Sequence, residues 1–439
     1  MVDLNLQTSD AGNLWKEDIP TKKFKPVSPS VMRQLGLSRE NLKHVNIIED
    51  LRNDPPNIVI AEAVRNVKFV QNFFKEQLLS KKSRYVMGLG VFQQLHADQQ
   101  GRKLLKPTNL RFKNIYRPYQ GQDIEGETVL VFRTGGIGDL LFIQPNLRYL
   151  KEKYNCYVKF ACGPQYQPMV KNWGCVDEVI DLPFPAETLI KSKYHMLFEG
   201  VIERCKEAET TNAYRLFSKW LGLNLPDEKL LPKQKPKPEL VNECVRILGE
   251  WGIIEKEQFI LAGSNFIVMQ LRASSPVRTP RHDFWLKIIN SLNNRGINVV
   301  LTDNPRQADN IQKFINMLDK PGMTFNFCQY SKSIDYTIAL TSLAKGTIAT
   351  DSALGHIAAS LNVKCYGIYG PFPGNIRLST YPKAQWIDAP RHCAPCFIHG
   401  HKPCPYASSD GYSPCYDELI NTPEKLDSLI YSIEEFIND

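Results

Sequence analysis

The run Arg133-Thr134-Gly135-Gly136-Ile137-Gly138-Asp139 places a carboxylate beside three glycines, directly after an apolar segment. Glycine tolerates positive φ and lets the backbone approach a ligand closely, and the start of a following helix presents free N–H groups. Asp139 stands at the start of this helix, a position where aspartate is favoured as a cap. The glycines do not follow the spacing G-x-G-x-x-G, so the run does not indicate a dinucleotide site.

A second run, Thr350-Asp351-Ser352-Ala353-Leu354-Gly355-His356, joins the end of a predicted strand to the start of a predicted helix. Backbone N–H groups and a hydroxyl at a helix start suit the binding of a diphosphate. His356 comes one helical turn after Ser352 and can face the same ligand. The alternative is that Asp351 and Ser352 only cap the helix and that His356 is a structural histidine.

A third group consists of Cys393, Cys396, Cys404 and Cys415. One C-x-x-C pair plus two further cysteines within 23 residues has the ligand count of a four-cysteine zinc site. The second C-x-x-C pair of a regular zinc site is missing, so unligated or redox-active thiols are the alternative. The chain has eleven cysteines in all, and this odd number fits a reducing compartment better than a disulfide framework.

Apolar, β-branched runs alternate with helical segments on both sides of a proline- and lysine-rich segment, and this alternation predicts parallel α/β sheets. The first set has strands at residues 128–132, 157–161 and 178–182 and a helix at 139–154. The second set has strands at 266–271, 297–302, 346–350 and 363–369 and helices at 284–293, 334–344 and 352–361.

The predicted architecture is two Rossmann-type, doubly wound domains that face a cleft, the usual place for a ligand. The first domain spans residues 127–231 and the second spans 241–439. Residues 232–240 are interpreted as a stiff, solvated linker because of their proline and lysine content. Residues 1–126 form an N-terminal extension for which no fold is predicted.

The segments GDLLFIQP, starting at Gly138, and TDSALGHIAASLNVKCYGIYGP, starting at Thr350, together resemble glycosyltransferase family nine, the heptosyltransferases of lipopolysaccharide synthesis. The resemblance covers about residues 127–439. It implies the two-domain GT-B fold, an inverting mechanism and no catalytic metal. It also implies that Asp139 is the general base and that Asp351 and Ser352 contact the donor phosphates.

The sequence departs from the family pattern where a cation usually precedes a Trp-Pro pair. Trp285 is present, but no proline follows it and no lysine precedes it. We assign the phosphate-binding cation to Arg272, Arg278 or Arg281, because the guanidinium fork pairs well with phosphate oxygens.

The net charge of +8 is uneven, because residues 1–127 carry 20 Lys and Arg against 14 Asp and Glu, and the rest of the chain carries 34 against 32. This surplus suggests an anionic acceptor, lipopolysaccharide or nucleic acid, near the N-terminal region, with a solvated basic face as the alternative. The first 20 residues lack the pattern of a signal peptide, and no run approaches the roughly 20 apolar residues of a spanning helix. We expect a soluble, cytoplasmic protein without a transmembrane segment.

The sequence therefore predicts a hexosyl- or heptosyl-type glycosyltransferase that uses a nucleotide-diphosphate sugar and a saccharide acceptor. It requires no metal for catalysis, and the four cysteines can hold a structural zinc ion. Two alternatives remain at this point, because a fold does not fix a function. One is a glycosyltransferase acting on modified nucleic-acid bases, and the other is a sugar-nucleotide epimerase or hydrolase with the same fold.

Overall fold

The computed structural model describes residues 2–6, 28–35, 46–51, 58–71, 75–97, 101–254, 265–398, 404–407 and 412–439. The chain divides into two compact units. Unit 1 holds the described residues up to Leu230, and unit 2 holds those from Leu231 to Asp439. Each unit is described by itself.

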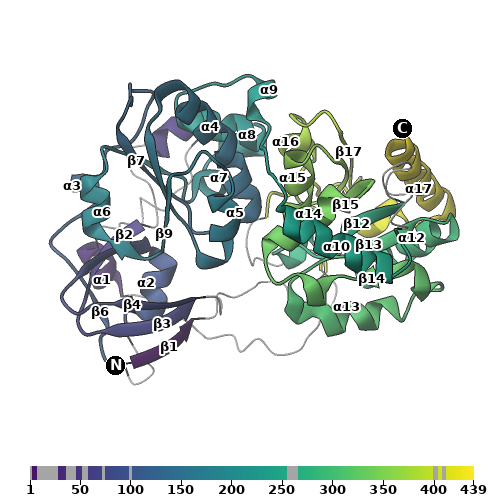
Figure 1. The fold of residues 1–439 in the computed structure, drawn as a ribbon, viewed down its shortest axis with the longest axis horizontal. Coiled ribbons are helices and arrows are strands. Elements are labelled where there is room, and N and C mark those ends of the chain that lie inside the picture. Colours follow the sequence, from purple (N-terminus) through teal and green to yellow (C-terminus); the bar gives the residue numbers. More distant parts are fainter. Residues whose placement is uncertain are drawn as a thin grey trace. The chain divides into compact units, whose positions relative to one another are not determined.

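Unit 2 is built on a six-stranded sheet in which all neighbouring strands of the described chain are parallel (Figure 1). The order is β14 (Thr324–Asn326), β13 (Asn298–Leu301), β12 (Phe266–Gln270), β15 (Gly346–Ala349), β16 (Lys364–Tyr369) and β17 (Ala384–Asp388). In chain order this is 3-2-1-4-5-6, the order of a doubly wound sheet. The order reverses between β12 and β15, so the loops after these two strands open at one point of the sheet edge.

Helices cover both faces of this sheet, because successive strand residues point to opposite sides. Val268 packs with α10 (Pro238–Glu250) and α14 (Ile334–Ser342). Its neighbours Ile267 and Met269 pack instead with α12, α13 and α17 on the other face. The remaining helices of the unit have these bounds: α12 His282–Asn294, α13 Ala308–Ile315, α15 Ala353–Ser360, α16 Asn375–Leu378 and α17 Pro423–Asn438.

Unit 1 contains a four-stranded parallel sheet among its described residues. Its order is β11 (Tyr194–Leu197), β7 (Thr128–Phe132), β8 (Tyr157–Ala161) and β9 (Glu178–Ile180). Here the order reverses between β7 and β11. The helices that follow these strands have these bounds: α4 Ile137–Tyr154, α5 Gln167–Lys171, α6 Ala186–Lys191, α7 Val201–Arg204, α8 Ala213–Trp220 and α9 Asp227–Leu230.

The N-terminal region forms two small sheets that are part of unit 1. One has the order β10 (Phe184–Pro185), β5 (Arg84–Gly88), β2 (Ile58–Ala63) and β6 (Leu105–Pro107), and the other β1 (Val2–Leu6), β3 (Val67–Gln71) and β4 (Lys75–Leu79). Three short helices accompany them: α1 Pro29–Gln34, α2 Leu89–Leu95 and α3 Phe112–Ile115. Strand β10 lies between β9 and α6 in the chain, yet it pairs with β5.

A shared core explains why the N-terminal region belongs to unit 1. Ile58, Ile60 and Val86 of the N-terminal strands are buried in one cluster with Leu130 and Phe132 of β7. Burial of such side chains is the main favourable term in folding. The region is therefore packed onto one face of the parallel sheet.

The strands and helices predicted from the sequence are confirmed, with ends that differ by at most two residues. The prediction that residues 232–240 form a solvated linker is corrected by the structure at two positions. Residues Pro232 and Gln234 are buried, and the Gln234 backbone N–H donates to the Ser360 carbonyl at 3.0 Å. Buried and exposed residues alternate in this segment, because Lys233 and Lys235 point to solvent between and after the two buried residues, whereas composition alone indicated only stiffness.

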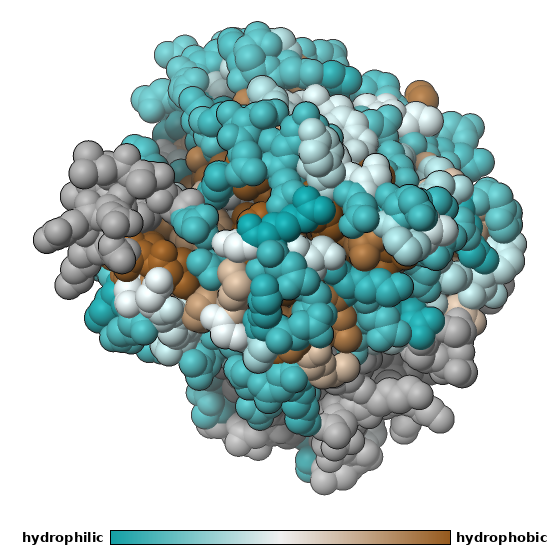
Figure 2. Space-filling model, turned by 90° about the vertical axis from the view of Figure 1, so that its right-hand side faces the viewer, coloured by the Kyte–Doolittle hydropathy of each residue, from teal (hydrophilic) through white to brown (hydrophobic). Residues whose placement is uncertain are grey.

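None of the described helices is long and apolar enough to cross a membrane. The face shown in Figure 2 is mostly hydrophilic, and its apolar residues lie in small patches among polar ones.

Candidate functional site

The glycine run of unit 1 forms the loop between β7 and α4, at the point where the strand order of the sheet reverses. Gly136 caps α4 with a φ of 84°, a value that favours glycine. A Cβ atom on Gly136 would lie 2.3 Å from the Asp139 carboxylate oxygen Oδ2. The glycine therefore both turns the chain and makes room for the carboxylate. Asp139 lies in the first turn of α4 rather than at the cap position.

The Arg133 guanidinium binds the Asp139 carboxylate. The guanidinium is buried and donates to Asp139 Oδ2 at 2.5 Å and to Glu203 Oε1 at 3.0 Å. It also donates to the carbonyl oxygens of Gly135 at 2.9 Å and Phe198 at 2.8 Å. Burial by itself disfavours the charge, but Asp139 and Glu203 raise the pKa of Arg133 well above its usual value. Arg133 therefore stays charged and fixes the position of Asp139, whose side chain is 21% exposed.

Two acidic residues of this site come from the segment after β11 and were not predicted. Glu203 shares the Arg133 guanidinium with Asp139, and Glu199 accepts from the Thr134 backbone N–H at 3.0 Å and from its hydroxyl at 2.6 Å. The only signal in the sequence was Arg133 itself, a basic residue between an apolar strand and a glycine turn. Such a residue needs buried acidic partners.

In unit 2, Asp351 stands at the corresponding reversal of strand order, directly beyond β15. Its carboxylate pairs with Arg278 Nη1 and Arg377 Nε, each at 3.2 Å. Burial would raise the pKa of Asp351, but Arg377 and Arg278 outweigh it and lower this pKa to about 2. Asp351 is thus an ionised anchor that holds two arginines at the sheet edge.

Ser352 occupies the N-cap position of α15 without making the capping bond that its residue type favours. Its Oγ, like Thr350 Oγ1, is buried and has no hydrogen-bond partner among the described residues. A buried hydroxyl without a hydrogen-bond partner destabilises the folded chain. A ligand atom that accepts a hydrogen bond from Ser352 would remove this cost.

His356 is 3% exposed, one turn further along α15. Burial lowers its pKa to about 4, against the opposing effect of Asp351, so the imidazole is neutral at pH 7. His356, which we expected to face the donor, is therefore a buried, neutral side chain in the neighbourhood of Asp351.

The three arginines proposed for phosphate binding differ in their surroundings. Arg272 is buried, with Nε 3.2 Å from Asp303 Oδ2. Arg278 lies in the 3-10 turn Pro276–Arg278 and donates to the Asp351 carbonyl at 3.0 Å. Arg281 is more exposed, and it lies 3.8 Å from an Asp417 oxygen and 3.9 Å from an Asp283 oxygen. Of the three, Arg278 is brought to the Asp351 loop.

Arg377, on α16, was missed by sequence reasoning. It is buried, stacks on the Phe372 ring at 4.8 Å and pairs with Asp351. No motif surrounds it, and its partner is 26 residues away. Only the fold brings them together.

All four cysteines of the C-terminal group line one small cavity of unit 2, together with Arg391. Burial raises the pKa of Cys415 to about 12, and the neighbouring cysteines act in the same direction. Among the described residues, no group of three or more His, Cys, Asp and Glu side chains is spaced to hold a metal ion. The four thiols thus line one cavity, but their sulfur atoms are not spaced to bind one common metal ion.

Comparison with known proteins gives a family match over part of the chain. The family model described as glycosyltransferase family 9 (heptosyltransferase) matches residues 213–406. No curated protein matches the chain significantly. A glycosyl transferase family 9 structure from Veillonella parvula is 11% identical, with a TM-score of 0.53 over 72% of this chain and 98% of that chain. The Escherichia coli ADP-heptose lps heptosyltransferase II is 16% identical, with a TM-score of 0.50 over 70% of this chain and 99% of that chain. The fold is that of GT-B glycosyltransferases, and the resemblance noted from the motifs is confirmed.

The buried, neutral state of His356 predicts a pH dependence of stability. Its pKa is about 4 in the folded chain against about 6.5 unfolded, so its contribution is complete above pH 6.5 and is lost as the pH falls towards 4. We expect the free energy of unfolding to fall by roughly 2–3 kcal/mol more in the wild type than in His356→Gln between pH 7 and 4.5. Urea unfolding at both pH values measures this difference. Parallel pH profiles for the two proteins would show that His356 titrates normally.

Proposed function

We propose that the chain is an inverting glycosyltransferase, because residues 213–406 match the family model of glycosyltransferase family 9 (heptosyltransferase). It moves a sugar, a heptose or another, from a nucleotide-diphosphate sugar to an acceptor hydroxyl of a glycan or lipopolysaccharide-like saccharide. The observation that carries the proposal is the partnerless, buried Ser352 hydroxyl at the start of α15, beside the paired charges of Asp351 and Arg278.

The donor diphosphate is assigned to unit 2. Arg278, Arg377 and Asp351 together carry a net charge of +1, which favours an anion. The start of α15 adds free N–H groups and the positive end of the helix dipole. Ser352 then donates its hydroxyl to a phosphate oxygen. The leaving diphosphate gains negative charge as the glycosidic bond breaks, and these groups stabilise that charge without a catalytic metal ion.

Asp139 is assigned as the general base. The acceptor oxygen attacks the anomeric carbon from the side opposite the diphosphate, so the new C–O bond forms as the bond to the phosphate oxygen breaks. The hydroxyl proton passes to the Asp139 carboxylate. Arg133 keeps that carboxylate in place, and after transfer Asp139 returns the proton to solvent.

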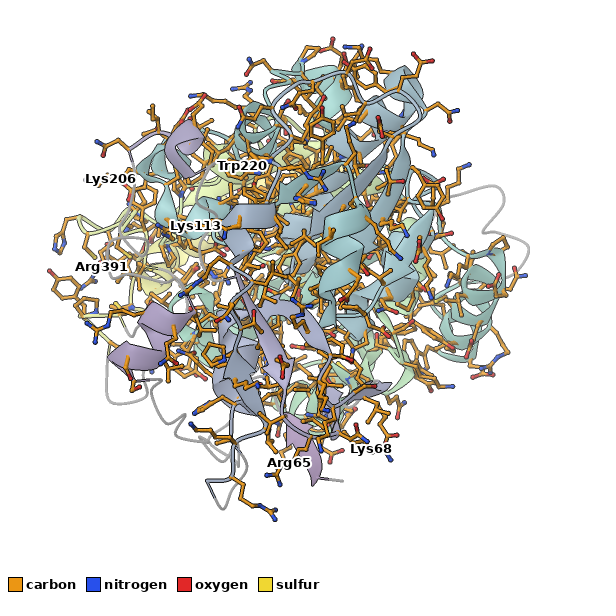
Figure 3. All side chains as sticks on the ribbon, turned by 90° about the vertical axis from the view of Figure 1, so that its left-hand side faces the viewer. Arg65, Lys68, Lys113, Lys206, Trp220 and Arg391 are labelled. Atoms are coloured by element: carbon orange, nitrogen blue, oxygen red, sulfur yellow. The ribbon has the colours of Figure 1, made fainter. Side chains whose placement is uncertain are left out.

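The structure does not favour the nucleic-acid alternative. Lys68 is paired with Glu76 at 2.5 Å and Lys106 with Glu62 at 3.0 Å, so part of the basic surplus is locally neutralised. Figure 3 shows the labelled Arg65 and Lys68 at one end of the N-terminal strands and Lys113 well away from them. A phosphate backbone needs a continuous row of cations. No observation favours an epimerase or hydrolase either.

Replacement of Asp139 by asparagine keeps the shape of the side chain and removes its basicity. We expect Asp139→Asn to lower turnover by about a hundredfold or more, the range for a general base, and to leave donor affinity nearly unchanged. Turnover is measured with a panel of nucleotide-diphosphate sugars, and donor affinity by calorimetry.

Glu203→Gln is the matched control, because it removes the other carboxylate on the Arg133 guanidinium. It should retain most of the activity. Near-normal turnover in Asp139→Asn, or a larger loss in Glu203→Gln, would refute the assignment of the base.

We further propose that the four C-terminal cysteines hold a structural zinc ion. Four thiolates are a complete ligand set for zinc, and all four cysteines line the same cavity. Rotation of the Cα–Cβ bonds would have to draw the sulfurs together, and binding would release the thiol protons.

Metal analysis tests this proposal on protein purified without added zinc. We expect about one equivalent of zinc per chain, which Cys396→Ser reduces and Cys175→Ser leaves unchanged, since Cys175 is buried in unit 1. A metal-free preparation that is fully folded and active would contradict the proposal.

A further inference from the structure

A second pocket lies within unit 1, between the N-terminal strands and the edge of the parallel sheet. Its volume is about 530 Å³. Its lining residues come from β4, β5, α5, β9, β10 and α6 and from the segments beside them, and β10 is hydrogen-bonded to β5. Neither the motifs nor the family domain at residues 213–406 include it.

One residue that lines the pocket has a buried side-chain amide without a hydrogen-bond partner among the described residues. Gln77 is 7% exposed, and neither its Oε1 nor its Nε2 has a hydrogen-bond partner among the described residues. Leaving both ends of a primary amide unsatisfied is costly, and a ligand that both donates and accepts hydrogen bonds would satisfy them. Gln167, which also lines the pocket, donates to Asp181 Oδ1 at 2.8 Å and is a second amide of the lining.

The charges around the pocket argue against an anionic ligand. Its charged lining residues are Glu76, Asp181 and Lys171, which sum to −1. The basic surplus of the N-terminal region therefore does not face this pocket. Leu78 and Pro185 add apolar surface to the lining. Amide groups beside apolar side chains suit an uncharged, hydroxyl-rich ligand such as a sugar.

Asp181 of the pocket lining and the loop that precedes Asp139 lie at the same edge of the parallel sheet, where the carboxyl ends of the strands meet. Asp181 directly follows β9, two strands away from β7, a separation of about 10 Å at the usual strand spacing of about 4.8 Å. The Tyr166 ring lies 3.2 Å from the Cβ position of Gly135 in the loop before α4, and the next residue is Gln167. Part of the pocket lining thus lies near the loop that precedes the proposed base.

We propose that this pocket binds an uncharged sugar unit of the acceptor and that Gln77 determines specificity for it. The inference rests on the proposed glycosyltransferase function and narrows the acceptor to one with a neutral sugar near the reacting hydroxyl. It gives the N-terminal strands a role in acceptor binding.

An array of neutral oligosaccharides, phosphorylated oligosaccharides and serine-containing peptides tests the proposal on the full chain. We expect neutral oligosaccharides to bind the wild type. Gln77→Leu, which keeps the size of the side chain, and Gln167→Leu should each weaken this binding at least tenfold, because the sugar hydroxyls lose their partners. Gln93→Leu replaces an amide of α2 outside the pocket and should leave binding unchanged.

Binding of a nucleoside diphosphate separates this inference from the proposed function. If the diphosphate binds all these proteins equally while Gln77→Leu loses the oligosaccharide, the pocket is the acceptor site. The inference is overturned if no neutral oligosaccharide binds, if Gln77→Leu leaves binding unchanged, or if only phosphorylated sugars or peptides are retained. Failure of the diphosphate to bind the wild type would instead count against the proposed function.

Discussion

In both units a charge is buried at the point where the strand order reverses, and it stays charged because its partners come from other parts of the fold. Arg133 is held by Asp139 and Glu203, and Asp351 is held by Arg278 and Arg377. An isolated buried charge costs several kcal/mol, and in each cluster two oppositely charged side chains compensate the buried ion. These clusters therefore fix the loops that follow β7 and β15, and the proposed chemistry depends on those loops.

The local elements around the site could be predicted because each is encoded by adjacent residues. Strand β7 ends directly before Arg133 and β15 ends two residues before Asp351, so the motif positions at the strand ends followed from the apolar runs in the sequence. The partners could not be predicted in this way. Arg377 is 26 residues from Asp351, and Glu203 is 70 residues from Arg133. Such pairs are created by the strand order, which sequence patterns do not specify.

The strand pairing of the N-terminal region was even harder to predict from the sequence. Its strands are short, and β5 pairs with β10, which comes about a hundred residues later in the chain. No repeated spacing marks such a pairing. The pairing and the shared core attach the region to the parallel sheet, and a consequence is the pocket that contains Gln77. The extra residues thus enlarge the unit that carries the proposed base.

The central claim is that the edge of the unit 2 sheet binds the donor diphosphate. Calorimetric titration of a nucleoside diphosphate into the wild type and into Arg278→Ala and Ser352→Ala tests it, with Arg272→Ala and Arg281→Ala alongside. The account predicts that Arg278→Ala weakens binding by roughly 1.5–3 kcal/mol, the range for a charge-assisted hydrogen bond. Ser352→Ala should weaken binding by about 1 kcal/mol, the value for a neutral hydrogen bond. Unchanged affinity in all four variants would show that the donor binds elsewhere.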